Sequence, residues 1–89
     1  MIINDKFVQL QGPFTHNQEL VDLIKVHFSN FQFIKRIGIQ GTYSNGCFLN
    51  GQKFEIGKTE ILELNEVHIT SIYFEKDEPA STIVDCVLE

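Results

Sequence analysis

The dipeptide Asn50-Gly51 is the feature that most limits the folds open to this chain of 89 residues. A two-residue hairpin turn requires positive φ at both central residues, and Asn and Gly tolerate that conformation best. An apolar run that includes Phe48 precedes the dipeptide, and another that includes Phe54 follows it. The sequence therefore predicts two antiparallel strands joined at Asn50-Gly51.

Alternating apolar and polar residues predict strands on both sides of that hairpin. A break at Gly57 precedes a strand that begins at Ile61. Between residues 31 and 40 the apolar side chains share one parity, except Ile34. The residues of that parity are Phe31, Phe33, Ile37 and Ile39. Further strands are predicted at 3–10, at 66–74 as one central strand with room for a bulge, and at 82–89.

One helix is predicted between the first strand and the strand at 31–40. Gly12-Pro13 ends the first strand, because proline cannot donate to a ladder. Thr15 and Gln18 then have the spacing of a capping box. Apolar residues recur every three or four positions until Ser29-Asn30, which predicts a helix over 16–29 with one face packed on the sheet. That face comprises Leu20, Leu23, Ile24, His27 and Phe28.

Together these elements predict one domain over residues 1–89 of the α+β class, mainly antiparallel β, with one helix near the N-terminus. The strands form a sheet or a sandwich-like arrangement, built from residues 31–74 and closed by 82–89. A chain of this size buries only somewhat over about 60% of its unfolded surface. Hydrophobic residues make up 43% of the chain, which is enough for a small core.

The last strand is apolar on both parities, whereas a strand with one face in water needs apolar residues on one parity only. We therefore expect its second face to be covered. A sandwich fold and a symmetric second copy of the chain are both candidates for that cover. The residues expected at such an interface are Val84, Cys86, Val87 and Leu88.

Charge and hydropathy argue against nucleic-acid and membrane partners. The formal net charge is -5 and no basic run occurs, so the chain lacks the phosphate-neutralising patch of nucleic-acid binders. No stretch approaches the roughly 20 apolar residues of a membrane span, and the first residues do not resemble a signal peptide. We expect the protein to be made inside a cell.

No pattern of catalytic, cofactor-binding or metal-binding residues is found. His16, His27 and His68 lack the close pairing of a metal site. His68 and Ser71 fall on opposite faces of the predicted strand, which argues against a hydrolase triad. Cys47 and Cys86 have no activating neighbour in the sequence and are expected to be reduced, inert core residues. We therefore predict no cofactor and no enzymatic activity.

One loop has the composition of a contact loop, in which a tyrosine stands among small polar residues. The alternative is a plain connection between strands, because Gly, Ser and Asn are common turn residues. The candidate contact residues of this loop are Thr42, Tyr43, Ser44 and Asn45.

Five short patterns follow one another between residues 31 and 89: Gly38-Ile39-Gln40, Asn50-Gly51, Ile56-Gly57, Thr59 and Glu63-Leu64. In this order they resemble a small module of virion structural proteins from phages and prophages of Gram-positive bacteria. The loop at 41–45 departs from the proline-bearing loop of that family, and Glu60 replaces a usual glycine. The resemblance implies a β-rich packing module in which these residues are turn and core positions and none is catalytic.

The function expected from this resemblance is that of a structural or assembly module of a virion, assembled in the bacterial cytoplasm. Its partners would be itself, as a homo-oligomer, or another virion protein. The alternative is a small acidic inhibitor or regulator encoded by a phage, which binds a basic host protein as a monomer. The spread of the acidic residues along the chain favours the first, because mimics of nucleic acid concentrate charge on one face.

Overall fold

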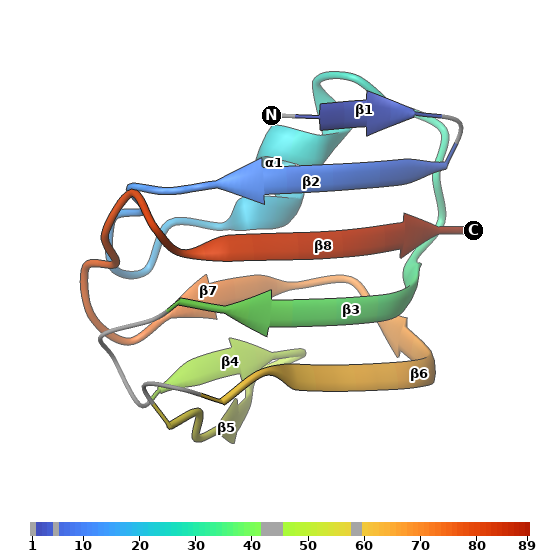
Figure 1. Cartoon of the computed structure of the whole chain (residues 1–89). Helices are drawn as coiled ribbons and strands as arrows, with labels where there is room; N and C mark the ends of the chain where they lie inside the picture. The colour runs from blue at the N-terminus through green and yellow to red at the C-terminus, as the bar shows by residue number, and fades with distance from the viewer. Residues whose placement is uncertain (1, 5, 42–45, 58–59) are drawn as a thin grey trace.

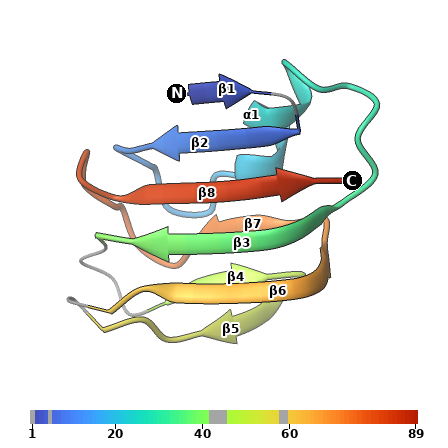
Figure 2. The same cartoon turned by 45° about the vertical axis from the view of Figure 1, so that its right-hand side comes forward.

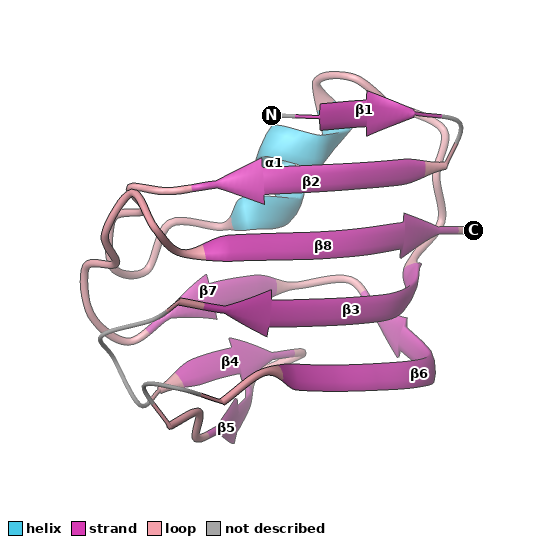
Figure 3. Cartoon of the chain, viewed as in Figure 1, coloured by secondary structure: helices cyan, strands magenta, loops and turns pink. Residues whose placement is uncertain are grey.

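Two antiparallel sheets and one helix form the chain in the computed structural model, which describes residues 2–4, 6–41, 46–57 and 60–89. The larger sheet has five strands in the order β1-β2-β8-β3-β6, and the smaller has three in the order β5-β4-β7 (Figures 1 and 3). The predicted α+β class, mainly antiparallel β, is confirmed. The elements are β1 (Ile2–Asn4), β2 (Phe7–Gln11), α1 (Leu20–Lys25), β3 (Ile34–Gln40), β4 (Cys47–Leu49), β5 (Gln52–Phe54), β6 (Leu62–Ile69), β7 (Ile72–Phe74) and β8 (Ile83–Leu88).

The core lies between the five-stranded sheet and a second layer made of α1 and the three-stranded sheet. Both parts of that layer lie behind the same face of the larger sheet, with α1 behind β1 and β2 and the smaller sheet behind β3 and β6 (Figure 2). Buried apolar side chains from both sheets and from α1 form one cluster. No described element covers the other face of the five-stranded sheet (Figure 2).

Strand β8 lies in the middle of the larger sheet, between β2 and β3, and is antiparallel to both. Its buried side chains Val84, Cys86 and Leu88 point into the core. The alternate residues, which include Val87, are half-buried on the uncovered face. Among the described elements none covers this second face, so a sandwich built from them does not supply the cover that the sequence predicted for β8.

Strand β3 is shorter than predicted and contains an irregularity that changes which side chains face the core. Its pairing with β8 shifts by one residue between Ile34 and Arg36, so Ile34 pairs with Leu88 and Ile37 with Cys86. Ile34 is fully buried beside Ile37, although strict alternation placed it on the opposite face. The bulge is the reason, because an extra residue reverses the parity of everything beyond it.

The predicted hairpin at Asn50-Gly51 is confirmed, with φ of 53° and 80° at the two residues. Asn50 also binds the chain where it passes from β6 to β7. Its Nδ2 donates to the carbonyl of His68 at 2.7 Å, and its Oδ1 accepts from the backbone N–H of Thr70 at 2.8 Å. The prediction of one strand over 66–74 is wrong, since the chain leaves the larger sheet after Ile69 and enters the smaller one at Ile72.

The first predicted strand is also two strands, β1 and β2, which form a hairpin whose turn includes Lys6 with φ of 60°. The helix is shorter than the predicted span of 16–29. The backbone N–H of Asn17 donates to the carbonyl of Phe74 at 2.9 Å, so this segment bonds to the smaller sheet before the helix begins. Gln18 does accept from the N–H of Thr15 at 3.2 Å, but in a turn that precedes the helix.

Glu19 is the N-cap of α1 and also joins the helix to the smaller sheet. One carboxylate oxygen accepts from the backbone N–H of Ile72 at 2.7 Å and from that of Val21 at 3.3 Å. The other oxygen accepts from the hydroxyl of Ser71 at 2.5 Å. Hydrogen bonds to a charged group are stronger than neutral ones, so this half-buried carboxylate holds the two parts of the second layer together.

Replacing Glu19 with Ala should lower the free energy of unfolding by about 2 kcal/mol, because the cap is lost and the N–H of Ile72 loses its partner. Urea denaturation followed by circular dichroism measures the change. Asp22→Ala is the control, since Asp22 is an exposed acid of the same helix. The control should change stability by only about 0.5 kcal/mol. Equal effects of the two substitutions would contradict the role of Glu19.

Candidate functional site

The uncovered face of the five-stranded sheet, called the open face below, is built by the alternation of side chains along four strands. Antiparallel pairing aligns the outward residues in rows, for example Phe7, Val87, Arg36 and Asn65. Three of its side chains are apolar and half-buried: Phe7, Ile83 and Val87. The open face comprises Phe7, Gln9 and Gln11 of β2, Ile83, Asp85 and Val87 of β8, Arg36, Gly38 and Gln40 of β3, and Glu63 and Asn65 of β6.

A hollow of about 440 Å³ lies on this face and is called the face hollow. Gly38 forms part of its floor, and a Cβ added there would meet no atom closer than 4.0 Å. Asp85 and Glu63 are the cross-strand partners of Gly38 on its two sides. The carboxylate of Asp85 accepts from the Nε2 of Gln9 at 2.9 Å. Because Gly38 has no side chain, the face hollow deepens between two acidic residues.

Arg36 lies two residues from Gly38 on the same strand and also lines the face hollow. The side chains of Arg36 and Glu63 are both exposed. Within the described part of the chain, no salt bridge involves either of them. The open face thus presents a cation, two acids and an apolar pair, Phe7 and Val87, side by side.

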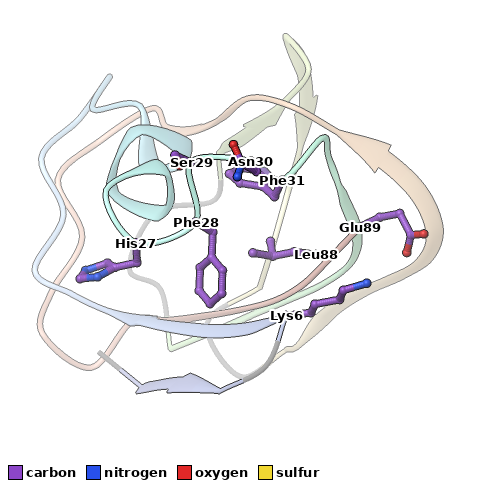
Figure 4. Close-up of a pocket in the computed structure, with 8 residues that line it drawn as sticks. All are labelled: Lys6, His27, Phe28, Ser29, Asn30, Phe31, Leu88 and Glu89. Carbon is purple, nitrogen blue, oxygen red and sulfur yellow. The ribbon is translucent and has the colours of Figure 1, made fainter.

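A second hollow, also of about 440 Å³, lies where the α1–β3 connection passes the ends of β2 and β8 (Figure 4). Figure 4 shows Phe28 and Leu88 pointing into this end hollow, with Lys6 and Glu89 on its rim. Phe31, in the connection, completes the apolar lining. Its apolar interior and charged rim suit one apolar side chain of a partner or a small apolar ligand.

The rim of the end hollow is organised by an ion pair. The Nζ of Lys35 donates to the carboxylate of Glu89 at 2.9 Å. This hydrogen bond and the charge of Lys35 hold the pKa of Glu89 below its usual range, and the charge of Lys6 adds a smaller effect. Glu89 is therefore a carboxylate at neutral pH.

The residues predicted from the sequence fall in different places. Val84 and Cys86 are core residues of the chain itself. Leu88 lines the end hollow, and Val87 lines the face hollow on the opposite side of β8. An interface on the open face can therefore use only the outward residues of β8, of which Val87 is one. The predicted contact loop, Thr42, Tyr43, Ser44 and Asn45, lies outside the described residues.

Sequence reasoning missed the face hollow because its residues come from four strands that are far apart in the chain. Arg36, Gly38, Glu63 and Asp85 become neighbours only through the order of strands in the sheet. In β3 the alternate positions from Arg36 to Gln40 carry no apolar side chain, and this is the one local signal that pointed to the open face. It does not indicate which strands lie beside β3.

The side chains considered for catalysis or metal binding include three with structural partners. Ser71 donates its hydroxyl proton to Glu19, and the Nδ1 of His16 lies 2.7 Å from the carboxylate of Asp77. The ring of His68 stacks on Phe33 with centroids 4.0 Å apart. Across residues 2–4, 6–41, 46–57 and 60–89, no three His, Cys, Asp or Glu side chains are grouped as metal ligands. None of the helices described is long and apolar enough to cross a membrane.

Comparisons with protein-family models, with curated proteins and with solved structures found no match for this chain.

Both cysteines should be unreactive in the folded protein and reactive after unfolding. Each is a free thiol with no exposed surface, and burial raises the pKa of Cys47 and of Cys86 to about 12. At neutral pH both thiols are therefore protonated and shielded from reagents. Ellman's reagent should titrate almost no thiol in buffer and two per chain in guanidinium. Rapid reaction of either cysteine in the native state would contradict this result.

Lys35→Met should raise the pKa of the Glu89 side chain toward its ordinary value, because it removes the hydrogen bond and the charge that lower it. Carbon-13 NMR titration of the side-chain carboxyl measures this pKa. Since the folded pKa is the lower one, the stabilising contribution of the pair is complete above the unfolded pKa and is lost as pH falls through the folded value. Lys53→Met, which removes a different ion pair with Glu75, is the control and should not change the titration.

Proposed function

We propose that this chain is a non-enzymatic module that acts through protein–protein contacts made by its open face. The observation that carries the proposal is the apolar pair Phe7 and Val87, which lie side by side on that face next to Arg36. In an antiparallel sheet with one face in water, the side chains on the water-facing side are usually polar. Aromatic residues and arginine are enriched in protein interfaces, so this combination is typical of a contact surface.

The resemblance of residues 31–89 to a virion module supports a more specific proposal. In this view the chain is a structural or assembly component of a phage or prophage particle from a Gram-positive bacterium, assembled in the bacterial cytoplasm. Its partners are copies of itself or another virion protein. Gly38, one of the residues that carry the resemblance, lies in the face hollow, and so the matched pattern and the contact surface share a residue.

A second candidate function is that of a small acidic inhibitor or regulator that binds a basic host protein. The observation in its favour is that Glu63 and Asp85 flank the face hollow on a chain of net charge -5. An arginine or lysine of a host target would fit between these carboxylates. This regulator would bind as a monomer, whereas the virion module is used in many copies.

Immunodetection of the protein in purified particles of its parent phage separates these two functions. The virion module should be present in every intact particle at many copies per particle, and should remain after a high-salt wash. The inhibitor should be found only in lysates of infected cells. Consistent absence from washed particles would reject the structural role and favour the regulator.

A further inference from the structure

We infer that the open face binds a second copy of this chain, with Arg36 of each copy inserted into the face hollow of the other. The inference rests on the proposed function, because it takes the open face as the contact surface and names its occupant. It adds the partner, the symmetry and the residues that determine the register.

The open face carries complementary charges. Arg36 supplies a guanidinium, and the face hollow supplies two carboxylates, from Glu63 and Asp85, on either side of Gly38. Arginine binds carboxylates through several donors of fixed geometry. A surface that carries both the cation and its acidic receptor is complementary to itself.

The cation and the centre of its acidic receptor lie close together on one strand. Arg36 and Gly38 are separated by one residue on β3, or about 7 Å along the strand. Consider a two-fold axis that lies between the two facing sheets and runs perpendicular to β3 at the level of Ile37. This axis brings position 36 of one copy opposite position 38 of the other. Each Arg36 then stands over the Gly38 of the other copy. This is an isologous contact, in which both halves are made by the same residues.

An arginine side chain between the two copies needs room in the face opposite to it. Packed sheets lie about 10 Å apart, and that distance is normally filled by side chains from both faces. Opposite Arg36, however, Gly38 contributes no side chain, and a Cβ there would meet its nearest atoms, from Asp85, Glu63 and Leu62, only at 4.0 Å. The long arginine side chain can therefore extend across the gap and reach both acids without displacing other atoms.

Charged and apolar side chains of the open face would gain partners in the dimer. Within the described residues, Arg36 and Glu63 are exposed and no salt bridge involves either of them. The pair Phe7 and Val87, in the same row as Arg36, would be removed from water in the dimer. The contact thus covers these two half-buried apolar side chains and supplies a partner for Arg36 and for Glu63.

The size of the face predicts a weak dimer. Five strands about 4.8 Å apart and five residues long cover roughly 400 Å² in plan. Stable interfaces bury about 800 Å² on each partner. The isolated protein should therefore dimerise only at high concentration. In a particle that holds many copies, multivalency would raise the overall affinity of these weak contacts.

Charge reversal on the two sides of the contact provides the test. Arg36→Glu places like charges opposite each other in both symmetric contacts, and so does Glu63→Arg. An equimolar mixture of the two variants restores opposite charges in both contacts of a mixed dimer. Sedimentation equilibrium up to about 0.5 mM should show a dimer for the unmodified chain, dissociation constants at least about tenfold higher for each variant alone, and recovery in the mixture.

Gly38→Leu is an independent test that changes no charge. The φ of Gly38 is not positive and there is room for a Cβ, so the variant should fold, while its side chain fills the face hollow and excludes Arg36. It should be monomeric, with the circular dichroism spectrum of the parent. Lys76→Glu is the control, because it reverses an exposed charge outside the open face and should leave the dimer intact.

Each contrary result rejects a defined part of this inference. A monomer at every concentration for the unmodified chain rejects self-association, but leaves the proposed function standing with another virion protein on the open face. A dimer that persists in all three open-face variants places the contact elsewhere. If Arg36→Glu and Glu63→Arg are each monomeric and their equimolar mixture also stays monomeric, the pairing of Arg36 with Glu63 is rejected. Absence from particles, in contrast, rejects only the virion role.

Discussion

The fold depends on the insertion of β8 between β2 and β3, because this pairing joins the two ends of the chain in one sheet. The side-chain bond from Gln9 to Asp85 alone spans 76 residues. Val84 and Cys86, together with Leu88, supply the centre of the core from this strand. Such long-range pairing must pay the entropy of closing a large loop before its contacts form. The sheet can therefore be completed only when nearly the whole chain is in place.

The second layer is held to that sheet by polar side chains as well as by the core. Asn50 fixes the point where the chain crosses between the sheets, and Glu19 joins α1 to the start of β7. Both residues satisfy backbone donors that a sheet end and a helix start would otherwise leave without partners. These bonds allow very short elements, such as a helix of six residues, to be stable where they are.

Because the described second layer lies on one side, the other side of the five-stranded sheet is left uncovered and available for contacts (Figure 2). Its character follows from the pairing register, which brings Arg36, Glu63 and Asp85 around Gly38. The end hollow in Figure 4 lies on the other side of β8, so this strand borders both candidate sites. A contact module built in this way keeps its core and its binding surface on alternate residues of the same strands.

The sequence by itself determined the antiparallel β-rich class and the hairpin at Asn50-Gly51, because turn chemistry and alternation are local properties. Only the tertiary structure decided that Ile34 shares the core face with Ile37, that residues 66–74 divide between two sheets, and that the helix begins at Leu20. Bulges, sheet crossings and caps depend on partners distant in the chain. The face hollow belongs to the same category, since the order of the strands makes neighbours of residues that no local pattern connects.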